Sequence, residues 1–137
     1  MINERSFGVV PLQFRPTGVF LFLVQHHSLA WLLPKGRPES LESPQETAAR
    51  ELEEETGLCV VEWLEHAPFV EHYSFKRHDQ DIYKEATYFP ALVEGIVHLQ
   101  SEELLDGQWI PIDQFPEKAT FPEMRRIASE VVSWLGS

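Results

Sequence analysis

Cysteine, basic side chains and long apolar segments are scarce in this sequence. Its 137 residues contain a single cysteine, Cys59, so no disulfide can form within the chain and a reducing cytoplasm fits best. There are 11 Lys and Arg against 22 Asp and Glu, and the net charge of −11 argues against a general nucleic-acid binder. No apolar run is long enough to cross a membrane, and the N-terminal MINERSFG lacks the pattern of a signal peptide.

What the chain does contain is the composition of one globular domain over residues 1–137, without repeats or low-complexity tracts. No obligate protein partner is evident. Cys59 lies in an apolar stretch, which favours a buried thiol over a nucleophile. The acidic residues lie mostly late in the chain, whereas Arg5, Arg15, Lys35 and Arg37 leave the first 37 residues locally basic.

The pattern of apolar residues and turns predicts strands alternating with two separated helices. Residues 6–14 and 19–25 form a predicted hairpin, the second strand of which is buried on both faces. Pro90 lies within a long predicted strand and should mark a sheet edge or a bulge, because it has no N–H to donate. The remaining strands are predicted at 30–33, 59–64, 69–75, 82–97 and 108–111, and a closing amphipathic helix at 122–135. These elements indicate an α/β fold with a sheet held between helices.

The other helix is bounded by clear end signals. Ser43 is an N-cap residue, Pro44 suits the first helical position, and Glu46 completes a capping box. Gly57 lies where a left-handed C-terminal residue is expected. On this helix Ala48, Ala49, Leu52 and Thr56 share the predicted buried face.

Three glutamates form one arc beside that buried face. Glu51 and Glu55 are a like-charged pair one turn apart, Glu54 lies beside them, and all three are near the helix C-terminus, where anions are disfavoured. Most charge runs are simply solvated helix faces. Here like-charged neighbours and anions near a helix C-terminus occur together, and a bound divalent cation would offset their repulsion. Oxygen ligands without a nearby Cys favour Mg²⁺, or Mn²⁺ as a substitute, over zinc.

The flanking residues favour the cation. Residues 36–58 match every fixed position of the motif G-x5-E-x7-R-E-U-x-E-E-x-G-U, in which U is aliphatic, at Gly36, Glu42, Arg50, Glu51, Leu52, Glu54, Glu55, Gly57 and Leu58. The chain therefore resembles the Nudix hydrolases, and the resemblance implies an α/β/α sandwich with a mixed sheet and hydrolysis of a nucleoside diphosphate linked to another group. It implies Glu51, Glu54 and Glu55 as metal ligands and Glu51 as general base. Arg50, one turn from Glu46 and Glu54, would orient carboxylates, and Glu42 would brace the loop or a metal-bound water, or be a simple surface acid.

Stretches outside this box resemble one group of the family, the bacterial asymmetrical bis(5′-nucleosyl)-tetraphosphatases. They are Ser6–Pro11, Trp31–Gly36, Glu71–Phe75, Lys84–Phe89 and Phe121–Arg125. The resemblance implies that Lys35 and Lys84 contact the phosphate chain, that the Gly36 backbone approaches the ligand, and that Tyr73 stacks on an adenine. Tyr73 could instead be a half-buried strand aromatic. Glu103 would add a metal contact, with Glu102 as its rival.

Three residues depart from that group. Arg37 replaces a usual His, Leu104 replaces a frequent His, and Gly107 stands where some members have a second base-stacking tyrosine. These departures leave the metal centre intact and put the second nucleoside pocket in doubt. The histidine pair His26-His27 is interpreted as part of a polar loop rather than as metal ligands.

The expected activity is Mg²⁺-dependent cleavage of dinucleoside polyphosphates, with diadenosine tetraphosphate yielding ATP and AMP. Nudix hydrolysis of capped or triphosphorylated RNA, or of nucleoside triphosphates, is the nearest alternative. The acidic surface weighs against the RNA substrates. A non-catalytic nucleotide-sensing module would be expected to lack box carboxylates, and an acidic scaffold helix would leave Gly36, Glu42 and Arg50 unexplained.

Overall fold

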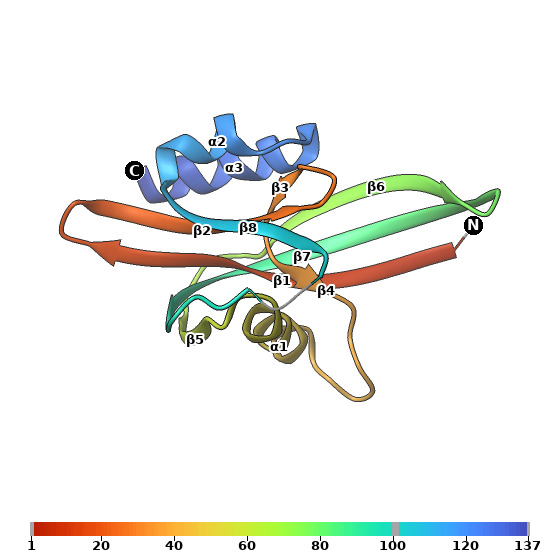
Figure 1. Ribbon diagram of the computed structural model, residues 1–137, viewed down its shortest axis with the longest axis horizontal. Helices are drawn as coiled ribbons and strands as arrows, with labels where there is room; N and C mark the ends of the chain where they lie inside the picture. The colour runs from red at the N-terminus through yellow and green to blue at the C-terminus, as the bar shows by residue number, and fades with distance from the viewer. Residues whose placement is uncertain (1, 100–101, 137) are drawn as a thin grey trace.

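In the computed structural model, which describes residues 2–99 and 102–136, eight strands form one mixed sheet (Figure 1). The central path is β3-β2-β1-β7-β5, and β4, β6 and β8 pair with β1, β7 and β2 respectively. β1 and β7 run parallel, and every other pairing is antiparallel. The strands are β1 (Ile2–Arg15), β2 (Gly18–His26), β3 (Trp31–Leu32), β4 (Lys35–Gly36), β5 (Cys59–Trp63), β6 (Phe69–Arg77), β7 (Gln80–Glu94) and β8 (Leu104–Pro111).

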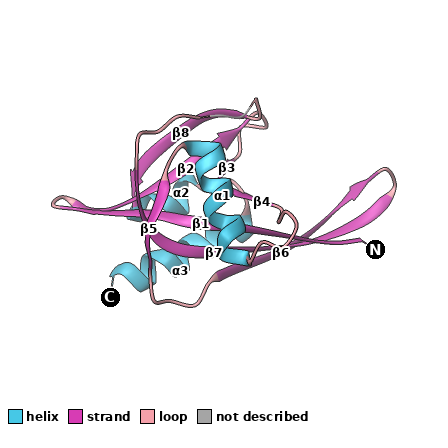
Figure 2. Ribbon diagram, turned by 90° about the horizontal axis from the view of Figure 1, so that it is seen from below, coloured by secondary structure: helices cyan, strands magenta, loops and turns pink. Residues whose placement is uncertain are grey.

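Helices cover the two faces of this sheet. Helix α1 (Pro44–Thr56) lies against one face, and α2 (Phe115–Lys118) with α3 (Pro122–Gly136) lies against the other, with a short 3₁₀ turn at Ile112–Gln114 before α2 (Figures 1 and 2). Alternation along β1 divides the core, because Val10 and Leu12 pack on the α2–α3 side while Val9 packs with Ala48 and Leu52 of α1. This arrangement confirms the predicted α/β sandwich.

Local signals fixed both ends of α1. Ser43 Oγ accepts from the Glu46 N–H at 3.2 Å and Glu46 Oε1 accepts from the Ser43 N–H at 2.9 Å, which is the predicted capping box. Gly57 closes the helix in the left-handed region, at φ 79°. The buried face differs at one position, because Thr47 is buried with Ala48, Leu52 and Thr56 while Ala49 is half-buried.

Tertiary pairing moved several strand boundaries away from their predicted positions. β8 begins at Leu104 rather than at the predicted residue 108, because residues 104–107 pair with the end of β2. β7 ends at Glu94 rather than at residue 97, where Gly95 turns the chain at φ 131°. The predicted hairpin is present, with β1 extended to residue 2, and residues 21–24 of its second strand are buried as expected.

Two interpretations of single residues were wrong. Pro90 lies neither at a sheet edge nor in a bulge but inside β7, opposite Val10, at the point where β7 exchanges its neighbour β6 for β5. Its carbonyl oxygen accepts from the Leu64 N–H at 3.0 Å. The missing N–H of Pro90 therefore lies on the side of β7 where the partner strand changes, and no ladder hydrogen bond is lost there. Cys59 is exposed rather than buried, because β5 is an edge strand that pairs with β7 alone.

The helices of the described residues include none that is both long and apolar enough to cross a membrane.

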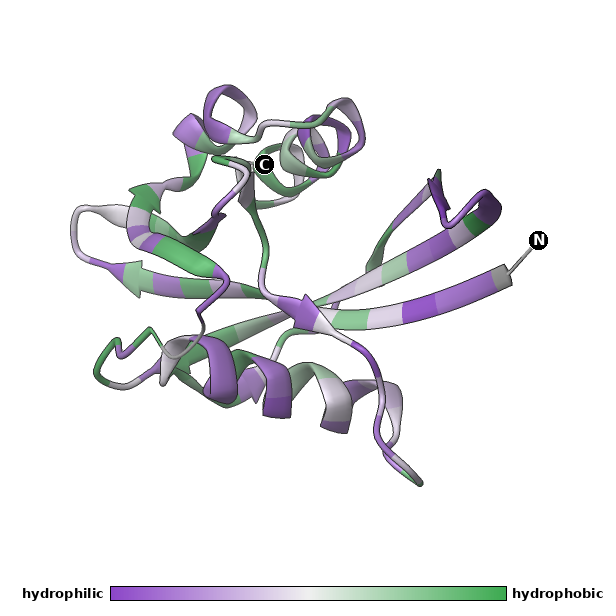
Figure 3. Ribbon diagram, turned by 45° about the vertical axis from the view of Figure 1, so that its right-hand side comes forward, coloured by the Kyte–Doolittle hydropathy of each residue, from purple (hydrophilic) through white to green (hydrophobic). Residues whose placement is uncertain are grey.

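The sheet extends well beyond its helical layers at one end. The start of β1 and the β6–β7 hairpin project together from the body of the molecule, and their outer part is largely hydrophilic (Figures 1 and 3). The extension is one continuous ladder, with Glu4 opposite Lys84 on one side of β7 and Arg77 opposite Gln80 on the other. It places residues from the chain start beside residues near position 80.

β4 attaches to this sheet through a glycine. Gly8 pairs with Lys35, and a Cβ at Gly8 would lie 2.2 Å from the Pro34 carbonyl oxygen and 2.8 Å from Lys35 Cβ. Only a residue without a Cβ lets the two backbones come this close. The position of Lys35 and Gly36 therefore depends on Gly8.

Gly8→Ala should lower the free energy of unfolding by about 1–3 kcal/mol, because the nearest obstructing atom is the backbone carbonyl oxygen of Pro34, which cannot rotate away. Urea denaturation provides the measurement. Gly136→Ala is the matched control, since no atom lies within 4 Å of a Cβ at that position, and its effect should be within about 0.5 kcal/mol. Equal stabilities for the two variants would contradict the role given to Gly8.

Candidate active site

The acidic side of α1 faces a cavity of about 600 Å³ at the edge of the sheet, beside β4. The cavity brings together seven of the residues selected from the sequence, which come from β4, α1, β7 and the turn before β8. They are Lys35, Gly36, Glu51, Glu54, Glu55, Lys84 and Glu103. The rival Glu102 does not line it. Tyr73 lines a neighbouring cavity, and Glu42 and Arg50 lie behind the carboxylates. The structure thus places these residues, while their individual roles stay predictions.

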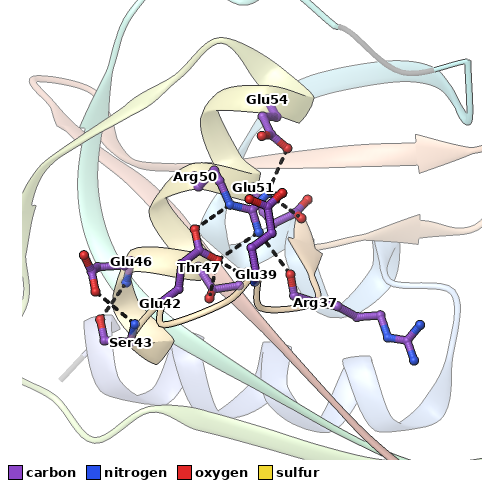
Figure 4. Close-up of polar contacts among 9 residues, drawn as sticks. All are labelled: Arg37, Glu39, Glu42, Ser43, Glu46, Thr47, Arg50, Glu51 and Glu54. Atoms are coloured by element: carbon purple, nitrogen blue, oxygen red, sulfur yellow. Dashed lines mark hydrogen bonds and ion pairs between the residues drawn. The ribbon is translucent and has the colours of Figure 1, made fainter.

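Arg50 is the hub of the polar contacts on α1 (Figure 4). Its guanidinium donates to Glu42 at 2.6 and 3.0 Å, to Glu51 at 3.1 Å and to Glu54 at 3.0 Å. A further bond of 3.0 Å reaches the Arg37 carbonyl oxygen and ties down the loop before the helix. The predicted orienting role fits these contacts, although the expected partner Glu46 is engaged in the capping box instead.

Glu42 braces the loop between β4 and α1. Its carboxylate accepts from the Glu39 N–H at 2.8 Å and from the Thr47 hydroxyl at 2.9 Å, in addition to its two bonds from Arg50. The bonds from Arg50, followed by the Glu39 N–H, lower the pKa of Glu42 to about 2. These contacts support bracing over a simple surface position.

The carboxylates that face the cavity shift in the opposite direction. Burial raises the pKa of Glu55 to about 8, and the charge of Glu51 adds to that shift. Burial also raises the pKa of Glu51, against the lowering effect of Arg50. A Cβ at Gly36 would lie 2.0 Å from Glu51 Cδ, so the glycine is what makes room for this carboxylate. The site concentrates negative charge that the protein alone does not neutralise.

The donor set fits a divalent cation. Glu55 Oε2 is buried and has no hydrogen-bond partner among the described residues, a costly state for a carboxylate oxygen. All the candidate ligands are carboxylates, the oxygen donors that Mg²⁺ prefers. In the described parts of the chain no three acidic, His or Cys side chains converge on one point, and Glu51 and Glu54 are turned toward Arg50. Binding through all three carboxylates requires Glu54, whose side chain is 57% exposed, to turn from Arg50 to the cavity.

Two lysines supply positive charge on the same cavity wall. Burial lowers the pKa of Lys35, while the carboxylates Glu71 and Glu55 oppose that shift. Burial, and then the charge of Lys35, lowers the pKa of Lys84. Cations that are partly desolvated and close to one another are suited to binding an anion.

An aromatic cavity of about 400 Å³ adjoins the first and shares Lys35 with it. Tyr73 and Phe75 of β6 stack at 6.2 Å, and Phe121, which is 47% exposed, lies across from them at the start of α3. Burial raises the pKa of Tyr73 to about 12, so its hydroxyl is neutral. Tyr73 is half-buried, and the predicted stacking role and the alternative of a strand aromatic both agree with this position.

Sequence reasoning missed three residues of the carboxylate cavity: Ser6, His26 and Arg37. Ser6 Oγ is buried without a hydrogen-bond partner in the described structure, and the resemblance of the stretch Ser6–Pro11 gave this residue no role. The sequence showed His26 only as half of a histidine pair. Its place at the cavity follows from a register shift between Gln25 and His26, which the pairing of β2 with β8 produces. Burial and then Lys35 lower the pKa of His26.

The low pKa of Glu42 predicts a pH-dependent contribution to stability. Because the folded-state pKa of about 2 lies below the ordinary glutamate pKa of 4.5, the contribution is present above pH 4.5 and is lost as the pH falls toward 2. Glu42→Gln should therefore be less stable than wild type at pH 6, and the gap should close on acidification. Denaturant unfolding at several pH values measures it, with Glu53→Gln, an exposed position on the same helix, as control. A gap that stays constant from pH 6 to pH 2.5 would contradict the pairing with Arg50.

Comparisons with known proteins agree with this geometry. A NUDIX domain model matches residues 3–134. The putative mutator protein MutT4 of Mycobacterium tuberculosis is 30% identical over 103 residues, covering 73% of this chain and 40% of that protein. The chain thus spans less than half the length of this relative.

Two solved structures show the same fold. The Ap4A hydrolase of C. elegans, in a binary complex, has a TM-score of 0.72 at 18% identity, covering 97% of this chain and 98% of that one. The NUDIX domain of Shewanella oneidensis NrtR, in complex with ADP ribose, has a TM-score of 0.77 at 15% identity, covering 98% and 90%. Because the domain model spans nearly the whole sequence, and Gly36 and the three glutamates of the box line one cavity, this chain belongs to the Nudix hydrolase family.

Proposed function

We propose that this protein is a cytoplasmic Mg²⁺-dependent pyrophosphohydrolase that cleaves dinucleoside polyphosphates, with diadenosine tetraphosphate yielding ATP and AMP. One observation carries the proposal. A cavity lined by carboxylates and lysines adjoins a cavity lined by Tyr73, Phe75 and Phe121, and Lys35 belongs to both. A polyphosphate attached to a nucleoside needs this combination of an electrostatic site and an aromatic site.

The aromatic cavity supplies the nucleoside end of the site. Stacking of a base on Tyr73 contributes about 1–3 kcal/mol and tolerates different bases. The Lys35 ammonium lies 6.0 Å from the centre of the Tyr73 ring, so a base held on that ring has its phosphates near Lys35. Lys84 lines the next part of the cavity and extends the positive wall along the phosphate chain.

At the other end, Glu51, Glu54, Glu55 and Glu103 would hold the metal. Bound Mg²⁺ would neutralise phosphate oxygens and make a water more acidic. Glu51 is the proposed general base, because it faces the cavity and Arg50 fixes its orientation. Arg50 and Glu42 hold the helix and its preceding loop in register with this site.

The similarity to a C. elegans Ap4A hydrolase supports the dinucleoside substrate, while the relative named as a mutator protein supports nucleoside triphosphates as the competing class. The net charge of −11 disfavours long RNA, for which phosphate contacts along a basic surface supply most of the affinity.

A substrate panel with Mg²⁺ decides between these classes. Diadenosine tetraphosphate should give the highest kcat/KM, with ATP and AMP as the products, when compared with nucleoside triphosphates, ADP-ribose and triphosphorylated RNA. Chromatography that resolves the products measures both the rate and the bond cleaved. A higher kcat/KM for nucleoside triphosphates, or symmetric cleavage to ADP, would overturn the proposed substrate.

Glu54→Gln and Glu55→Gln should each lower kcat on the order of a hundredfold or more, because each removes a charge that the metal needs. Glu55→Gln should also raise metal-free stability at pH 8, since a folded-state pKa of about 8 means that ionising Glu55 opposes folding as the pH rises above 4.5. Steady-state kinetics and denaturant unfolding measure the two effects.

Glu53→Gln is the matched control for both effects, as an exposed glutamate of the same helix that does not line the cavity. Full activity in both Glu54→Gln and Glu55→Gln would refute the metal assignment.

A further inference from the structure

Positive side chains gather at one end of the carboxylate cavity, although the chain as a whole is strongly acidic. Lys84 and Arg37 line the cavity, and Arg77 lies next to them at the tip of the β6–β7 hairpin. The three come from different parts of the chain and meet because the sheet extension lies beside the loop that follows β4 (Figures 1 and 3). Only the tertiary fold brings these three side chains close together.

A single buried carboxylate oxygen holds the two arginines together. Glu4 Oε2 lies 2.8 Å from Arg37 Nη2 and 2.9 Å from Arg77 Nη1, and the Glu4 side chain is 5% exposed. Hydrogen bonding by Arg77, together with the charge of Arg37, lowers the pKa of Glu4 despite its burial. Both guanidinium groups are therefore anchored from below by an ionised glutamate.

The anchoring leaves most of each guanidinium available. The side chains of Arg37 and Arg77 are 60% and 46% exposed, and each guanidinium has five N–H groups of which Glu4 occupies one. In Figure 4 the Arg37 side chain points away from the Arg50 network, although its backbone carbonyl belongs to that network. Phe75 supports Arg77 from the other side, with the guanidinium 5.3 Å from the ring centre.

The charge of this group is not balanced. Arg37, Arg77 and Lys84 are three cations around one carboxylate, Glu4, and the mutual repulsion contributes to the lowered pKa of Lys84. Two guanidinium groups held in fixed positions fit the oxygens of a phosphate group better than they fit an apolar ligand. These three side chains therefore favour binding of an anion that has several oxygen atoms.

We propose that Arg37 and Arg77, held together by Glu4, form a phosphate-binding subsite at the end of the carboxylate cavity that favours substrates with longer polyphosphate chains. The inference rests on the proposed function and deepens it. The phosphates nearest the cleaved bond occupy the carboxylate cavity with Lys35 and Lys84, and the chain then continues past Arg37 to Arg77. A chain that is too short fills the cavity and stops before Arg77.

A chain-length series tests this subsite. For the wild-type protein, kcat/KM should rise at least tenfold from diadenosine triphosphate to diadenosine pentaphosphate, the scale expected for one charge-assisted contact. Arg77→Gln should bring that ratio near one, mainly by raising KM for the longer substrate. Arg77→Lys, which keeps the charge but loses the fork, should give an intermediate ratio.

Arg5→Gln is the control for charge. Arg5 is an exposed neighbour of Glu4 on β1 that points to the opposite face of the sheet, so its loss changes the net charge equally without touching the subsite. It should keep the wild-type ratio. Equal ratios in Arg5→Gln and Arg77→Gln would refute the subsite and leave only a general electrostatic effect.

Binding without turnover separates this inference from the proposed function. With metal chelated, calorimetry should show inorganic tripolyphosphate binding at least tenfold more tightly than pyrophosphate, and Arg77→Gln should abolish the difference. That result without any cleavage of dinucleoside polyphosphates would uphold the subsite while the proposed function fails. Cleavage with equal binding of the two probes in wild type would refute the subsite alone.

Discussion

The arrangement of the site depends on one guanidinium surrounded by carboxylates. Arg50 reaches Glu42, Glu51 and Glu54 from a position that is 20% exposed, so its charge offsets part of the repulsion along α1 and fixes the loop that leads into the helix. The hydrogen bonds to Glu42 first, and then the bond to Glu54, raise the pKa of Arg50 further above its usual range, against the lowering effect of burial. Glu55 has no guanidinium partner of this kind: its Oε2 lacks a hydrogen-bond partner among the described residues, and its carboxyl lines the cavity, where burial raises its pKa to about 8.

A second constraint is the place of β4 at the edge of the sheet. Its two residues pair with β1 next to Gly8, where the close backbone contact brings Lys35 between the carboxylate cavity and the aromatic cavity. Gly36 then makes room for Glu51. β4 therefore lies between the carboxylates of α1 and the aromatic side chains of β6, so that both groups can contact one ligand. The local departures from ordinary packing rules therefore concentrate where the chemistry is proposed.

Gly107 is one of the positions at which the sequence departs from the tetraphosphatase group that it resembles. A Cβ there would lie 2.5 Å from the Phe22 ring, which is itself in edge contact with Trp109. A tyrosine at this position would need that aromatic pair to move. In the proposed dinucleoside substrate, the second nucleoside would therefore be held by other groups, and the cationic end of the cavity would contact the phosphate chain.

The sequence by itself determined the elements whose rules are local. The capping box and Gly57 defined α1, the i, i+3 and i, i+4 spacing aligned its three glutamates, and the box residues identified the family. Only the tertiary structure decided features that depend on contacts between distant segments: the start of β8, the exposed edge position of Cys59, the place of Pro90, and the entry of Ser6 and His26 into the cavity. Helix ends are governed by hydrogen bonds within a few residues, whereas strand limits depend on partners as far apart as Phe20 and Pro111, 91 positions along the chain. The pairing of Glu4 with Arg77, 73 positions apart, is of this second kind, and no local pattern in the chain could have revealed it.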